Sequence, residues 1–137
     1  FGPGVNSDDM RVFAEFARSI IEHKDIRLLT RGETQRMYLY TADAATAVLC
    51  VLTRGANGEV YNAANEDTYC SVKEMAELVI NELGNGNQKV IIDVNGSANR
   101  GFNPVQAVYL DTTKIKRLSW NCTTGLVDMY KRMIECM

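Results

Sequence analysis

Several features are scarce or missing in this chain of 137 residues, and each absence excludes a class of protein. The four cysteines, Cys50, Cys70, Cys122 and Cys136, form no CxxC pair, and one histidine accompanies them, so we expect no bound metal and no redox motif. Apolar runs stay far shorter than the roughly 20 residues that cross a bilayer. We therefore expect a cytoplasmic protein with reduced cysteines and no membrane partner.

Charge of one sign is also lacking. Fifteen Lys and Arg residues stand against 17 Asp and Glu, for a net charge of -2, and no short window is dense in basic residues. A chain of this kind has no large footprint for phosphate backbones, so we expect no nucleic-acid partner. With 46% apolar residues, residues 1–137 are long enough to bury a core, and we expect one single domain.

The chain opens on Phe1 inside the turn-like string Phe-Gly-Pro-Gly, and not on Met. This start suggests a piece of a longer protein, although removal of a signal peptide or a tag would leave a similar end. The Gly-rich turn G-x-G-x-x-G, which cradles a dinucleotide pyrophosphate at a helix N-terminus, does not occur. We therefore expect no cofactor-binding site in these residues.

Periodicity predicts an α/β fold with about five helices and several short strands. The first helix is expected to be capped by Ser7, with Asp8 and Asp9 in its first turn. A largely buried helix is expected over residues 42–54, ending at a left-handed Gly55. Three further helices are expected after Ser71, after Asp111 and over residues 126–137. Strands are expected over residues 26–30, 36–40, 60–63, 89–93 and 108–110.

The strand over residues 36–40 is predicted to separate two environments. Met37 and Leu39 alternate with Arg36, Tyr38 and Tyr40. Successive side chains of a strand point to opposite faces. The first pair is therefore assigned to the core and the other three to a working face.

Several short motifs occur in a fixed order along the chain, and together they resemble a known family. They are Phe-Gly-Pro-Gly (1–4), Gly-Glu-Thr-Gln-Arg-Met-Tyr-Leu-Tyr-Thr-Ala-Asp (32–43), Gly-Glu-Val-Tyr-Asn (58–62), Ser-Val-Lys-Glu (71–74), and Leu-Asp-Thr-Thr-Lys-Ile (110–115) with Ser-Trp (119–120). This series is similar to the C-terminal part of the extended short-chain dehydrogenases, specifically the NAD-dependent epimerase/dehydratase family acting on nucleotide sugars. The resemblance implies a substrate-binding portion whose Rossmann half is absent from the chain.

In that family the Rossmann half binds NAD and supplies a catalytic Tyr-x-x-x-Lys pair, and the C-terminal half closes over the nucleotide diphosphate. The resemblance places a pyrophosphate-binding arginine at Arg36, for which a solvated or salt-bridged strand arginine is the alternative. Arg27 and Leu29 match the strand that lies along the nucleotide base. Ser71 matches a position that touches the nucleotide in relatives, but its place in a capping box also explains a serine.

Ala107 stands about where many relatives carry a second phosphate-binding arginine. Arg100 or Gln106 is expected to take over that role, unless Arg36 and backbone donors suffice. Asn103 and Gln106 are candidates for hydrogen bonds to sugar hydroxyls, although Asn and Gly are also ordinary loop residues. Tyr69 and Lys73 spell Tyr-x-x-x-Lys, but they flank the predicted helix cap at Ser71, so we assign them no catalytic role.

The resemblance thus implies a chain that binds a nucleotide-diphosphate sugar for an NAD-dependent epimerase or dehydratase. We expect the chain alone to be inactive and to contain no catalytic residue. The full-length protein is expected to be a homodimer. The alternative is a non-catalytic module that uses the same fold to sense a ligand or bind a protein, since Ala107 and Leu29 depart from the family pattern.

Overall fold

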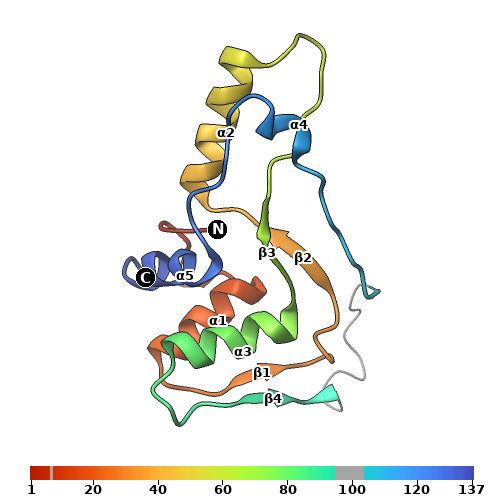
Figure 1. Ribbon diagram of the computed structural model, residues 1–137. Coiled ribbons are helices and arrows are strands. Elements are labelled where there is room, and N and C mark those ends of the chain that lie inside the picture. Colours follow the sequence, from red (N-terminus) through yellow and green to blue (C-terminus); the bar gives the residue numbers. More distant parts are fainter. Residues whose placement is uncertain (7, 95–103) are drawn as a thin grey trace.

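The computed structural model describes residues 1–6, 8–94 and 104–137, which form two lobes joined by a pair of strands (Figure 1). The elements in chain order are α1 (Val12–Ile21), β1 (Ile26–Leu28), β2 (Gln35–Tyr38), α2 (Thr41–Arg54), β3 (Asn65–Ser71), α3 (Val72–Leu83), β4 (Val90–Ile92), α4 (Thr113–Lys116) and α5 (Leu126–Ile134). The predicted α/β class and its five helices are confirmed.

The larger lobe is built from α1, α3 and α5, with β1 and β4 along one side (Figure 1). Apolar residues at helical spacing on the three helices meet in one core, whose most buried members include Phe16, Met75, Met129, Tyr130 and Met133. β1 and β4 pair in parallel, with Ile26 opposite Val90. The predicted strands at 26–30 and 89–93 and the amphipathic last helix are therefore confirmed, with small shifts at their ends.

The smaller lobe contains α2 and α4, which pack through Ala47, Ile115 and Trp120. α2 was predicted to be largely buried, and this is wrong: Val48, Leu49 and Leu52 are 59%, 61% and 76% exposed. The lobe is thin, so only one side of the helix is covered. Gly55 does end the helix, but its φ is -71°, and glycine fits there because a Cβ would lie 2.5 Å from the Val51 carbonyl oxygen.

Strands β2 and β3 connect the lobes as an antiparallel pair. The register pairs Arg36 with Cys70 but Tyr38 with Asn65, so β3 bulges between these two points. The regular pairing of β2 with β3 is therefore interrupted after Arg36. Tyr38 is half-buried against the main core and Tyr40 is buried within it, so the assignment of both to a working face with Arg36 is wrong.

Three other predicted boundaries are corrected. The first helix has Arg11 as its N-cap, and Asp9 precedes it, accepting a hydrogen bond from the Arg11 backbone N–H at 2.9 Å. Ser7, the predicted cap, lies outside the described residues. Residues 60–63 form no strand, and β3 begins at Asn65 instead. Residues 108–110 also form no strand, because pairing in this segment is limited to a bridge between Ala107 and Gln35.

Candidate functional site

Arg36 lies in the middle of three paired segments. β3 lies on one side of β2, and residues 106–108 lie on the other. The Gln35 N–H donates to the Gln106 carbonyl oxygen at 2.8 Å, and the Val108 N–H donates to the Gln35 carbonyl oxygen at 3.0 Å. Main-chain hydrogen bonds on both sides of β2 therefore hold the backbone that carries Arg36.

The Arg36 guanidinium is exposed and has no carboxylate partner among the residues that the structure describes. Cys70 is its neighbour in the register of β3. Burial, with a smaller contribution from Glu74, raises the pKa of the Cys70 thiol to about 11, so this neighbour is uncharged at neutral pH. The positive charge of Arg36 is thus available to an anion.

Gln106 is the polar side chain that contacts Arg36. Its Oε1 accepts a hydrogen bond from Arg36 Nη2 at 3.3 Å, although the two residues are 70 positions apart in sequence. The structure therefore brings together two of the candidate residues. An amide oxygen supports the guanidinium without cancelling its charge.

Arg27 lies on β1 of the larger lobe, and Leu29 directly follows this strand. Arg27 Nη1 forms an ion pair with Asp93 Oδ2 at 3.0 Å, and both groups are partly solvent-exposed. Leu29 follows the last residue of β1 and is half-buried. The Arg27 guanidinium thus has a charged partner within the chain, in contrast to that of Arg36, and a contact of Arg27 or Leu29 with the nucleotide base stays a prediction.

Ser71 forms the predicted capping box of α3. Its hydroxyl accepts from the Glu74 N–H at 3.1 Å, and the Glu74 carboxylate accepts from the Ser71 N–H at 2.7 Å. The Ser71 backbone N–H, and then the Ser71 hydroxyl, lower the pKa of the Glu74 carboxylate. The hydroxyl is thus engaged within the chain, and a contact with a nucleotide stays a prediction.

Substitution of Ser71 by alanine separates these two roles. We expect the free energy of unfolding to fall by about 1 kcal/mol, because α3 loses its N-cap. Binding of UDP to the protein should change less than twofold, since the hydroxyl acts at the helix terminus. Urea denaturation and calorimetric titration measure the two effects. Weaker UDP binding without a loss of stability would identify Ser71 as a ligand-binding residue.

Two predicted candidates, Asn103 and Arg100, lie outside the described residues. Tyr69, half of the Tyr-x-x-x-Lys string, is on β3 and donates its hydroxyl hydrogen to Gln35 Oε1 at 2.9 Å. Lys73 lies beyond the cap, in the first turn of α3, and is close to Glu77. The two side chains of the string therefore belong to different elements and have different partners.

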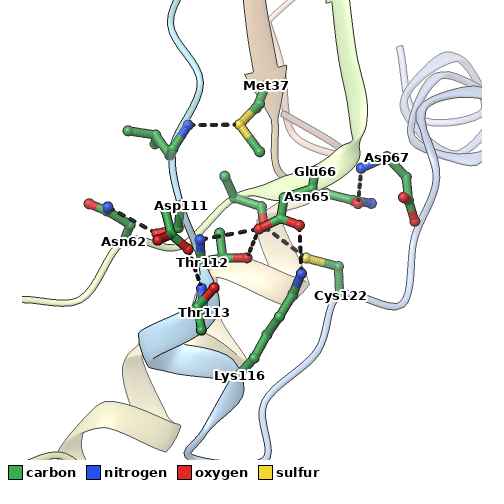
Figure 2. Close-up of polar contacts among 12 residues, drawn as sticks. Met37, Asn62, Asn65, Glu66, Asp67, Asp111, Thr112, Thr113, Lys116 and Cys122 are labelled. Atoms are coloured by element: carbon green, nitrogen blue, oxygen red, sulfur yellow. Dashed lines mark hydrogen bonds and ion pairs between the residues drawn. The ribbon is translucent and has the colours of Figure 1, made fainter.

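A polar network not predicted from the sequence holds the segment that follows Gln106 (Figure 2). The Glu66 carboxylate accepts from the Thr112 backbone N–H at 3.2 Å, from the Thr112 hydroxyl, and from Lys116 Nζ at 2.8 Å. Lys116 and then Thr112 lower the pKa of Glu66. Glu66 and Thr112 are 46 residues apart in sequence, so no local sequence pattern predicts the contact between them.

Met37 adds a second attachment point for that segment, because its Sδ accepts from the Leu110 N–H at 3.0 Å (Figure 2). Asn62 adds a third, donating to the Asp111 carbonyl oxygen at 3.1 Å. Residues 110–112 are thus attached to β2, to β3 and to the loop before β3. These contacts fix the chain just after Gln106 and help to hold Gln106 beside β2.

Arg36 is exposed on the surface of the molecule. Two surface hollows of about 450 and 290 Å³ occur in the described part of the chain, and neither is lined by Arg36. Within the same residues, no three His, Cys, Asp or Glu side chains gather in a way that would hold a metal ion. No described helix combines the length and apolarity needed to cross a membrane.

A family model matches the first part of this chain, and two curated relatives are similar to most of it. Residues 1–64 match the family model described as "NAD dependent epimerase/dehydratase family". The UDP-D-apiose/UDP-D-xylose synthase 2 of Arabidopsis thaliana is 28% identical over 142 residues, which cover 94% of this chain and 36% of that protein. The corresponding synthase of Oryza sativa subsp. japonica is also 28% identical, with the same coverage. The chain thus spans about a third of the length of these relatives.

Solved structures show the same fold. A UDP-glucose 4-epimerase of Thermotoga maritima with UDP-glucose superposes with a TM-score of 0.79 at 23% identity, covering 98% of this chain and 42% of the epimerase. A UDP-glucuronic acid 4-epimerase of Bacillus cereus, in complex with UDP-glucuronic acid and NAD, gives a TM-score of 0.73 at 21% identity, with 98% and 41% covered. The chain therefore has the fold of about two-fifths of each of these two epimerases.

Proposed function

We propose that the chain belongs to the NAD-dependent epimerase/dehydratase family, whose model matches residues 1–64, and that it supplies the substrate-binding part of an enzyme acting on nucleotide-diphosphate sugars. The observation that carries the proposal is the exposed Arg36 guanidinium, which has no carboxylate partner among the described residues and is held beside a neutral amide. Names of the relatives support the substrate class, since they specify UDP-linked sugars.

The chemistry of the site fits a diphosphate. A planar guanidinium donates two parallel hydrogen bonds to phosphate oxygens, and it stays charged at every physiological pH. Contacts to a diphosphate that does not itself react position the attached sugar. Arg36 would thus neutralise the diphosphate, and the binding energy of this remote group would help to orient the sugar for hydride transfer.

The proposal assigns NAD to a part of the protein outside these residues. The sequence has no G-x-G-x-x-G turn for a dinucleotide pyrophosphate, and the structural neighbours that hold NAD are more than twice as long as this chain. When bound, NAD would accept and return the sugar's hydride. In this proposal residues 1–137 form one substrate-binding domain without a catalytic residue.

We also propose that the protein is cytoplasmic and that it forms a homodimer. All four cysteines are free thiols, which fits a reducing cytoplasm. We further propose that the enzyme is a homodimer, as the family resemblance implies. The substrate-binding role itself does not depend on either point.

A direct test uses the chain of 137 residues by itself. We expect no hydride transfer with UDP-glucose and no NAD binding at micromolar concentrations, because the groups for both lie elsewhere. Absorbance at 340 nm measures the first, and calorimetric titration with NAD measures the second. A micromolar dissociation constant for NAD would show that this chain contains the cofactor site. It would refute the proposal that NAD binds outside these residues.

A further inference from the structure

We propose that Gln106 is a positioning residue: its side-chain amide orients the Arg36 guanidinium toward a diphosphate while leaving the charge of that guanidinium unpaired. This inference rests on the proposed function and deepens it. Gln106 would act through Arg36 and would not need to touch the substrate itself.

The backbone places Gln106 next to Arg36. The Gln106 carbonyl oxygen accepts a hydrogen bond from the Gln35 N–H at 2.8 Å. Gln35 directly precedes Arg36 in the chain. The isolated bridge pairs Ala107 with Gln35 in parallel. Both side chains thus extend from hydrogen-bonded backbone, which reduces the conformational freedom lost when they meet.

The side-chain contact is directional. Arg36 Nη2 donates to Gln106 Oε1 at 3.3 Å, so the amide occupies one of the five donor positions of the guanidinium and leaves the others for a ligand. A long arginine side chain without such a contact samples many rotamers, and fixing it on binding costs free energy. Gln106 would reduce this cost before the ligand arrives.

The neutrality of Gln106 is the second part of the argument. The other close contacts of arginine side chains in the described residues include carboxylates, as in Arg11 with Asp9 and Arg27 with Asp93. A carboxylate at position 106 would orient Arg36 equally well, but it would cancel the charge and compete with an anion. A glutamine provides the same reach without this penalty.

The test measures UDP binding to the protein at its full encoded length, by calorimetry, in a double-mutant cycle. The singly substituted proteins are Arg36→Ala and Gln106→Met, the second of which keeps the side-chain volume and removes the acceptor. We expect Gln106→Met to weaken binding about two- to tenfold, the range for one neutral hydrogen bond. Combined with Arg36→Ala, it should have no further effect, because no guanidinium is left to orient.

A third variant, Gln106→Glu, tests the role of neutrality. It should weaken UDP binding more than Gln106→Met does, even though it keeps a hydrogen-bond acceptor at the same reach. Circular dichroism and urea denaturation of each variant confirm that the fold is retained. A residue that only supports local structure would affect UDP binding equally with and without Arg36, and would not distinguish Glu from Met.

The outcomes separate the two levels of the argument. If Arg36→Ala leaves UDP binding unchanged, the proposed function of Arg36 fails and the role of Gln106 fails with it. If Arg36→Ala weakens binding while Gln106→Met has no effect, or has the same effect in both backgrounds, then only the positioning role is refuted. Coupled losses together with a larger loss for Gln106→Glu establish it.

Discussion

Replacing Arg36 by alanine in the protein at its full encoded length should weaken binding of a UDP-sugar about ten- to a hundredfold. One hydrogen bond to a charged group contributes about 1.5–3 kcal/mol, and a factor of ten in affinity corresponds to about 1.4 kcal/mol. The effect should be large because the family resemblance implies a second phosphate-binding arginine at position 107, where this chain has an alanine. Calorimetric titration with UDP-glucose measures the change.

Two comparisons make this result specific. Arg36→Lys should recover only part of the affinity, because an ammonium group cannot form the two parallel hydrogen bonds of a guanidinium. Arg117 provides the control, because it is also exposed and is the C-cap of α4 in the smaller lobe. Arg117→Ala should leave the dissociation constant for UDP-glucose within a factor of two. NAD affinity should stay the same in all three variants. If Arg36→Ala also remained within a factor of two, Arg36 would be an ordinary surface arginine.

Replacing Asp43 by alanine should destabilise the fold by about 3–5 kcal/mol. Asp43 is 3% exposed, and its carboxylate accepts from the Thr123 N–H at 3.2 Å, from the Thr123 hydroxyl at 2.7 Å and from the Thr124 N–H at 3.1 Å. These bonds attach the chain before α5 to the first turn of α2. Removal of the carboxylate leaves the buried Thr124 N–H without a partner and also removes the two hydrogen bonds from the exposed Thr123. A hydrogen bond to a charged group contributes about 1.5–3 kcal/mol, and less where water replaces it.

Such a loss is a large part of the 5–15 kcal/mol that stabilises an ordinary domain. Urea denaturation followed by circular dichroism measures it. Asp128 is a matched control, since it also lies in the first turn of a helix but is exposed, and Asp128→Ala should change stability by less than about 0.5 kcal/mol. Equal effects of the two substitutions would show that the contacts of Asp43 do not stabilise the fold.

Local sequence patterns correctly predicted the elements that are stabilised by interactions between residues close together in the chain. The capping box of Ser71 and the apolar stripe of α5 were both readable, because each interaction joins residues within one or two helical turns. Motif order also predicted a resemblance to the family whose model matches residues 1–64. Arg36 was recognised as a candidate from the alternation around it and from that resemblance.

Features that depend on contacts between distant segments of the chain could not be predicted from the sequence. The register between β2 and β3 shifts after Arg36, Tyr38 and Tyr40 pack at the core, and no local signal in the sequence marks either feature. The contact between Gln106 and Arg36 spans 70 residues, and the one between Glu66 and Thr112 spans 46. The apolar composition of α2 predicted that this helix is buried. Burial also requires other segments to pack over the helix, and the composition of α2 does not show whether this chain contains them.

The central claim is that this chain holds the diphosphate of a nucleotide sugar, and the distance from Arg36 to that diphosphate tests it most directly. A crystal structure of the protein at its full encoded length with UDP bound provides the measurement. We predict a guanidinium nitrogen within about 2.7–3.1 Å of a diphosphate oxygen, the range of a charge-assisted hydrogen bond. A diphosphate bound away from β2, with Arg36 directed into solvent, would contradict the claim.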